Sequence, residues 1–201
     1  MTKNRLEALS DGVIAIIITI MVLEFKVPHH PTFAALREME PTFLSYLLSF
    51  MYVGIYWNNH HHLLQVTTRI DGWVMWANLH LLFWLSLIPF ATAWVGEDFG
   101  EAVPTAFYGG ILVMDAVAAQ LLVFAIQRKE GPDWQWAKLT KNDVKIPISV
   151  VSYAAGIGLA FVYVWAAYAV FAALALVWIM PDRRIEEWFE SKGRAAEREP
   201  G

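Results

Sequence analysis

Cysteine is absent from this 201-residue chain, and charge is scarce. Without a thiol the chain forms no disulfide, no thiolate metal site and no cysteine nucleophile. Only 17% of its residues are charged, whereas a soluble domain carries about 25%. The charges lie in short clusters, and residues 146–181 hold none at all. Apolar stretches of this length leave too little polar surface for a soluble globule, so the sequence predicts an integral membrane protein.

Enzyme signatures are missing as well. The sequence contains no Gly-x-Ser-x-Gly, no His-Glu-x-x-His and no phosphate-binding loop, so we expect no enzyme, no cofactor, no nucleotide and no nucleic-acid partner. Three adjacent histidines, residues 60–62, resemble a metal site. Neighbouring helical residues point about 100° apart and cannot all reach one ion, so we expect no metal. We expect these side chains to donate instead to carboxylates such as Asp11; a haem held by His60 and His80 is an alternative.

Six membrane-spanning helices are predicted, which makes the fold class all-α. The last two come from dividing the charge-free run, because a single span needs only about 20 residues. The early polar pair Asp11 and Gly12 and the lack of a cleavage site favour a retained first helix over a signal peptide. A transmembrane domain of residues 1–181 is followed by a charged cytoplasmic tail of residues 182–201. The predicted spans are residues 6–27, 42–64, 73–95, 105–127, 146–162 and 165–180.

Basic residues predict the orientation of these spans. With six spans and a cytoplasmic N-terminus, thirteen of the fifteen Lys and Arg residues face the cytoplasm, and only Lys26 and Arg37 face outward. This bias agrees with the positive-inside rule and places both termini in the cytoplasm. The outer loop that contains Glu97, Asp98 and Glu101 is acidic and suits the attraction of cations.

The first predicted helix carries polar residues where lipid would disfavour them. A helical wheel at 100° per residue separates two faces. Asp11 lies opposite Ile16, and a buried Asp11 needs donors from a neighbouring helix. We expect Asp11 to fix the rotation of this helix, or else to lie close enough to the interface to be hydrated. One face holds Arg5, Gly12, Ile16, Thr19, Ile20, Leu23 and Val27; the other holds Glu7, Asp11, Ile14, Ile18, Val22 and Phe25, with Ser10 at its edge.

The second predicted helix carries a polar stripe at helical spacing. Its hydroxyl and amide residues recur every three or four positions, which is typical of a helix–helix contact. A water-lined surface is the alternative, but the stripe contains no acidic residue. We therefore expect packing. The stripe consists of Thr42, Ser45, Ser49, Tyr52, Tyr56 and Asn59.

Three segments resemble the transmembrane protein 175 family of potassium channels. The family's mark is Arg-x-x-x-Phe-Ser-Asp-Gly in the first helix, and this chain has Arg5 followed by Leu9-Ser10-Asp11-Gly12. Residues 78–93 and 57–62 match as well, so the resemblance covers most of the chain. The departure is Leu9, where the family usually has Phe; loss of that ring loosens packing without touching the expected pore face.

The resemblance implies a homotetramer with six helices per subunit, whose first helices line a central pore. Such channels lack a carbonyl filter, and this sequence has no Thr-Val-Gly-Tyr-Gly. Rings of Ile16, Ile20 and Leu23 would form the constriction, with Thr19 adding a hydroxyl layer. A polar network would join the first helix to the second and third. Its expected members are Arg5, Ser10, Asp11, Gly12, Trp57, His61, Asn78 and His80.

Physical chemistry limits what such a pore does. An Ile16 ring offers no ligand to replace the water around a cation, so it suits a dewetting gate. Thr19 hydroxyls are candidate cation ligands beside it. Glu24 lies near the outer mouth, where a ring of four would concentrate cations, or else it is a solvated interfacial carboxylate. The sequence thus predicts passive K+ permeation across a prokaryotic plasma membrane, with monovalent cations and lipid as partners; a proton- or ion-coupled transporter using Asp11 is the alternative.

Overall fold

The computed structural model describes residues 2–140, 144–180 and 188. Of the predicted tail at residues 182–201 only Trp188 is included, so that prediction lies outside the described residues. All regular structure in the described part is helical, in agreement with the predicted fold class. The elements are α1 (Lys3–Ile20), η1 (Met21–Glu24), α2 (Phe33–Arg37), α3 (Glu40–Gln65), α4 (Gly72–Leu85), α5 (Ile88–Glu97), α6 (Ala102–Glu130), α7 (Gln135–Thr140), α8 (Lys145–Ala160) and α9 (Val164–Ile179).

Three helical stretches are long and apolar enough to cross a membrane by length and composition: Lys3–Glu24, Gly72–Glu97 and Ala102–Glu130. Two shorter apolar helices, α8 and α9, have 16 residues each, a rise of about 24 Å. The helix α3 has 26 residues, and its polar side chains lower its hydropathy. The six predicted spans therefore correspond to about six main helices. In the described part of the chain, three stretches are both long enough and apolar enough to cross a membrane.

The first helix ends earlier than predicted. Its α-helical part stops at Ile20, a single 3₁₀ turn continues it to Glu24, and Phe25 is already extended with φ −75° and ψ 106°. The predicted end at Val27 is therefore wrong by three residues, and Val27 does not belong to the helical face. Since a 3₁₀ turn advances about 120° per residue, Leu23 also lies at a slightly different angle from that on a 100° wheel.

The third predicted span is divided into α4 and α5 at Ser86 and Leu87. Pro89, at the start of α5, explains the break. Proline has no N–H to donate to the carbonyl four residues earlier, and its ring crowds that carbonyl. The two helices still form one continuous stretch of 26 residues.

The division of the charge-free run is confirmed, because α8 ends at Ala160 and α9 begins at Val164. The predicted helices 146–162 and 165–180 differ from the observed ones by one or two residues. Two short helices lie outside the predicted spans, α2 (Phe33–Arg37) and α7 (Gln135–Thr140).

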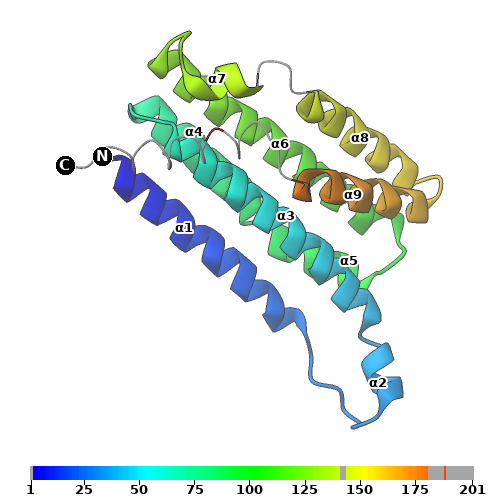
Figure 1. Ribbon diagram of the computed structural model, residues 1–201. Helices are drawn as coiled ribbons and strands as arrows, with labels where there is room; N and C mark the ends of the chain where they lie inside the picture. Colours follow the sequence, from blue (N-terminus) through cyan, green and yellow to red (C-terminus); the bar gives the residue numbers. More distant parts are fainter. Residues whose placement is uncertain (1, 141–143, 181–187, 189–201) are drawn as a thin grey trace.

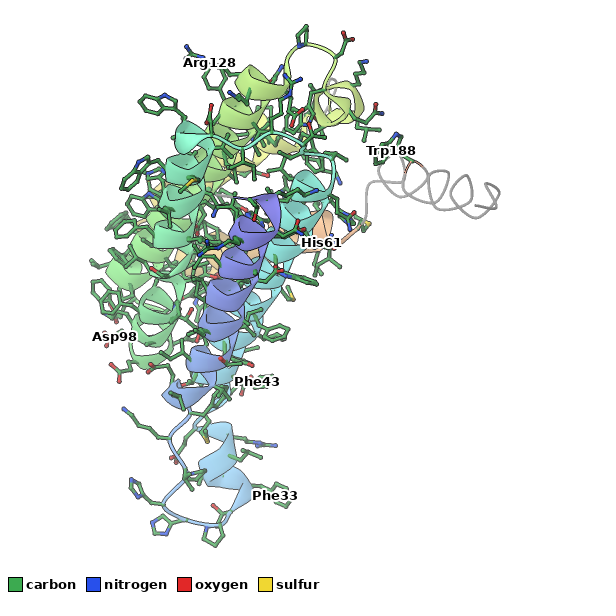
Figure 2. The ribbon with its side chains drawn as sticks, turned by 90° about the vertical axis from the view of Figure 1, so that its left-hand side faces the viewer. Phe33, Phe43, His61, Asp98, Arg128 and Trp188 are labelled. Atoms are coloured by element: carbon green, nitrogen blue, oxygen red, sulfur yellow. The ribbon has the colours of Figure 1, made fainter. Side chains whose placement is uncertain are left out.

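The helices form an elongated bundle with α1 along one edge (Figure 1). α1 packs on α3 and α4, α3 on α5, α4 on α6, and α8 on both α6 and α9. α2 lies at the end of the bundle opposite α7 and the N-terminus (Figure 1). Figure 2 shows the same polarity, with Arg128 at one end and Phe33 and Asp98 toward the other.

The polar stripe of α3 is packed, as expected. Ser49 is fully buried, and its Oγ lies 3.0 Å from the Tyr108 hydroxyl on α6. Thr92 on α5 donates to the same Oγ at 2.6 Å. Tyr52 donates to the Phe171 carbonyl on α9 at 2.7 Å. Ser49 and Tyr52 thus join α3 to other helices, whereas Ser45 and Asn59 donate to carbonyls of α3 itself. The buried part of the stripe therefore contributes to the register of the bundle.

Candidate functional site

One face of α1 is left uncovered by the rest of its own protomer. Ile16, Ile20 and Leu23 are 63%, 45% and 74% exposed, and Thr19 is exposed beside them. The opposite face is packed to the core through Leu6, Ile14, Ile17 and Met21, all at most 4% exposed. The four residues expected at a constriction thus share one accessible stripe, as the helical wheel predicted.

The Thr19 hydroxyl has its proton committed to the backbone. Its Oγ1 donates to the Ala15 carbonyl at 2.9 Å and approaches the Ile16 carbonyl at 3.1 Å. A hydroxyl oxygen keeps lone pairs when its proton is used in this way. Because Thr19 is exposed, its oxygen remains available as an acceptor on the uncovered face.

A buried chain of hydrogen bonds ties α1 to α4 and α3. Asn78 Nδ2 donates to Ser10 Oγ at 2.9 Å, and Ser10 in turn donates to the Leu6 carbonyl at 2.9 Å. His60 Nε2 lies 2.7 Å from Asn78 Oδ1. Since that oxygen accepts, His60 Nε2 is the donor, and neutral His60 keeps Nδ1 as an acceptor. Ser10, Asn78 and His60 are 0%, 0% and 4% exposed.

Asp11 makes a second tie to α3, nearer the surface. Trp57 Nε1 donates to Asp11 Oδ1 at 3.0 Å. The Trp57 indole also stacks on His61, with ring centroids 5.9 Å apart. Asp11 is half-buried, so this bond supplements the buried chain through Ser10. The two ties thus hold α1 at its packed face, through Ser10, and beside that face, through Asp11.

Two predicted members of the polar network, His61 and His80, do not join one helix to another through a hydrogen bond. His61 pairs with Gln65 at 2.7 Å and His80 with Trp84 at 3.0 Å, each within its own helix. His60 was expected to donate to a carboxylate such as Asp11, or else to hold haem or a metal. It instead donates to the Asn78 amide oxygen and is the histidine that joins the helices. It bonds to Asn78 while His80 bonds to Trp84, so the two do not present a shared axial site.

Two members of the family motif are also outside the hydrogen-bonded chain. Arg5 is exposed, and a Cβ at Gly12 would meet nothing within 4 Å. Both lie on the uncovered face of α1. Their surroundings in a single protomer therefore do not explain why the motif requires them.

The opposite end of α1 reaches an acidic region. Glu24 is half-buried at the end of η1. Lys26 pairs with Glu97 at 3.2 Å, and both side chains are more than half exposed. Asp98 and Glu101 follow directly. Among the described residues at this end of the bundle, acidic side chains therefore outnumber basic ones.

A cavity of about 650 Å³ lies on the other side of α3, away from the uncovered α1 face. It is bounded by α3, α6, α7, α8 and the end of α9, and Lys145 is among its lining residues. Its polar lining includes Tyr56, Asn59, His60, Gln120 and Tyr153. The cavity thus touches His60, whose other side belongs to the anchor of α1.

Sequence reasoning missed Asp115, which lies near the middle of α6 and is 0% exposed. Neither of its carboxylate oxygens has a hydrogen-bond partner among the described residues. The signal was present in the sequence, since Asp115 is the one charged residue between Glu101 and Arg128. An ionisable residue inside a span is a functional candidate by default.

The helical bundle, with three described stretches long and apolar enough to cross a membrane, is that of a multi-pass membrane protein. The family model described as endosomal/lysosomal potassium channel TMEM175 matches residues 5–89. A potassium channel from Chryseobacterium sp. (strain P1-3) is 50% identical over 187 residues, which are 93% of this chain and 97% of the relative. A potassium channel from Streptomyces collinus is 32% identical over 87% of this chain and 90% of its own length.

A solved structure shares the fold. It is the crystal structure of a lysosomal potassium-selective channel TMEM175 homolog from Chamaesiphon minutus, 29% identical with a TM-score of 0.77. The match covers 89% of this chain and 96% of that one. The chain belongs to the TMEM175 family of potassium channels, which is a family of channels and not of enzymes.

Proposed function

We propose that four copies of this chain assemble around a central pore lined by α1, through which K+ moves down its gradient. The observation that supports this is the uncovered stripe of Ile16, Thr19, Ile20 and Leu23. Its residues alternate with fully packed positions on a helix anchored by buried hydrogen bonds. A helix held so firmly on one side presents its other side to a partner in a defined orientation.

Ile16 forms the tightest apolar layer of the proposed pore and acts as its gate. A narrow ring of four isoleucines excludes water unless it widens, and a dehydrated cation finds no ligand there. The Thr19 oxygens, one turn further along, supply polar ligands to an ion that has passed the ring. Leu23 forms a further apolar layer, and Ile20 packs between the layers.

The anchor sets the rotation of α1 and therefore which residues face the pore. A turn of α1 by one residue would move each side chain by about 100° and would take Ile16 off the axis. The Ser10–Asn78–His60 chain opposes such a turn, because rotation would leave three buried polar groups without partners. Asp11, bound to Trp57, serves the same positioning role rather than that of an ion-coupling group.

The proposed orientation places both termini in the cytoplasm and the α2 end outside, in a prokaryotic plasma membrane. The distribution of Lys and Arg supports it, and so does the position of Arg128 and Asp98 at opposite ends (Figure 2). Glu24 and the neighbouring acidic loop then surround the outer mouth. Their charge raises the local concentration of cations.

The absence of cysteine permits a direct test of the pore face. Single-cysteine variants Ile16→Cys, Thr19→Cys and Leu23→Cys are reconstituted in liposomes and treated with a membrane-impermeant, charged thiol reagent. We expect modification to change K+ flux at these positions. Ile148→Cys is the matched control, since Ile148 is 54% exposed on α8; an equal effect there, or none at the α1 positions, contradicts the proposal.

Chemical crosslinking in mild detergent tests the assembly separately. We expect the ladder of crosslinked species to stop at four subunits. A ladder that stops at two contradicts the tetramer.

A further inference from the structure

Asp115 is the most costly side chain in the described structure to keep ionised. It lies in a 29-residue apolar helix with no exposed surface, and both of its oxygens lack a hydrogen-bond partner. An unpaired carboxylate removed from water is strongly disfavoured, and a membrane outside the protein adds no donor. A protonated carboxyl avoids that charge.

The groups around Asp115 do not supply a countercharge. The titratable residues that interact with it electrostatically are Tyr56 on α3, Tyr108 on α6 and Tyr153 on α8. The other titratable side chains on the helices packed on α6 have partners elsewhere. His80 bonds to Trp84, Glu97 to Lys26, Tyr168 to Thr105, and Lys145 of α8 donates to the Met180 carbonyl. No cation reaches Asp115 from the described residues.

Two of these tyrosines also line the cavity. Tyr56 and Tyr153 bound it, as do Ala116 and Ala119, the neighbours of Asp115 on α6. A space of about 650 Å³ therefore lies beside the part of α6 that carries Asp115. Hydroxyl groups both donate and accept, so water that enters from the cavity would find hydrogen-bonding partners on its way to Asp115.

We propose that Asp115 is a proton-binding site inside each protomer, separate from the α1 face, and that it exchanges its proton through the cavity. On release, the carboxyl gives H+ to water in the cavity, which carries it away as hydronium, and leaves a carboxylate among α3, α6 and α8. That charge has to draw in water or a cation, which loosens the packing of these helices. The site makes the stability of each protomer depend on pH, whether or not α1 lines a pore.

Infrared spectroscopy of the reconstituted wild-type protein tests the proton directly. We expect a carbonyl-stretching band of a protonated carboxyl at neutral pH, which shifts when the aspartates carry an isotopic label and is absent from Asp115→Asn. We also expect it to shift in heavy water without unfolding, because the cavity allows exchange. No such band overturns the proton site and implies a carboxylate that holds a cation; a band that resists exchange overturns the route through the cavity.

The pH dependence of unfolding gives a second readout. A carboxyl that keeps its proton in the fold and loses it on unfolding makes the fold less stable as pH rises. Above the pH range in which an ordinary aspartate titrates, the unfolding equilibrium constant of the wild type should rise about tenfold per pH unit relative to that of Asp115→Asn. Asp133→Asn, which changes an exposed carboxyl paired with Lys138, is the control and should follow the wild type. Parallel curves for wild type and Asp115→Asn contradict the proposal.

Discussion

Asn78 and Ser10 bond to each other at 2.9 Å with no exposed surface on either residue, and this bond connects the conducting helix proposed here to α4. The geometry makes Asn78 a two-sided partner, since its Oδ1 accepts from His60 while its Nδ2 donates to Ser10. A small amide at one position of α4 thus fixes the rotation of α1 relative to two other helices.

Asn78→Leu should destabilise the protomer by about 1–3 kcal/mol, because it leaves the His60 N–H buried without an acceptor. Thermal unfolding in mild detergent measures the loss. Asn58→Leu, at an exposed position of α3, is the control. An Asn78→Leu variant as stable as the control would show that the buried chain is not an anchor.

Asp11→Ala should reduce the fraction of assembled protein, because α1 loses its second tie to α3. A double-mutant cycle with Trp57→Phe, which removes the indole N–H and keeps an aromatic ring, should give a coupling energy of about 1 kcal/mol. Crosslinking yield and unfolding midpoint are the readouts. A fully assembled and stable Asp11→Ala protein would refute the role of Asp11 in holding α1.

Gly156→Ala should destabilise the contact of α8 with α9 by about 1–3 kcal/mol through overpacking. A Cβ at this position would clash with the buried Phe171 ring, whose Cζ would lie 2.9 Å away. Gly158→Ala on the same helix meets nothing within 4 Å and should be neutral or stabilising, since alanine favours helix more than glycine does. Equal effects of the two substitutions in thermal unfolding would contradict the packing described here.

The stability of the first turn of α4 should depend on pH through the Asp71 carboxylate. Its Oδ1 accepts from the backbone N–H groups of Trp73 and Val74 at 3.0 and 3.1 Å. These bonds, the one to Val74 foremost, and nearby Lys129 hold the pKa of the carboxyl below its usual value. A lowered pKa means that the stabilisation is complete above the ordinary carboxyl range and is lost as pH falls through the lowered value.

Hydrogen exchange in the first turn of α4 measures this effect. We expect exchange to accelerate as the pH is lowered in the wild type, beyond the intrinsic pH dependence of exchange. Asp71→Asn retains a good cap but has no charge to titrate, so its protection should vary less with pH. A wild type and an Asp71→Asn variant with the same pH profile would rule out the contribution of the charge.

The sequence predicts the helices well where composition alone decides them. The charge-free run divides where expected because a span has a fixed length, and the stripe on α3 packs because its spacing matches a helix. The break at Ser86 was not predicted, although Pro89 is its physical cause. The end of α1 was placed too late because hydropathy continues after the 3₁₀ turn to Glu24.

The sequence predicts the exposed residues of the candidate site on α1. It predicts the contacts of the buried residues only in part. A wheel of α1 groups Ile16 with Leu23 because periodicity is a local property. Which of three adjacent histidines joins the helices depends on how α3 is rotated against α4, so His60 could not be told from His61 by spacing. Asp115 was detectable as an isolated charge in an apolar helix, but its lack of partners required the packing around it.

The measurement that tests the central claim most directly is K+ flux into proteoliposomes, with Na+ as the competing ion. Wild-type protein is compared with Ile16→Asn and with the matched control Ile148→Asn. The account predicts K+-favouring passive flux in the wild type and in Ile148→Asn, and a higher flux with weaker discrimination in Ile16→Asn, because a polar ring wets the constriction. Unchanged flux and selectivity in a folded Ile16→Asn protein would contradict the claim that the exposed face of α1 forms the pore.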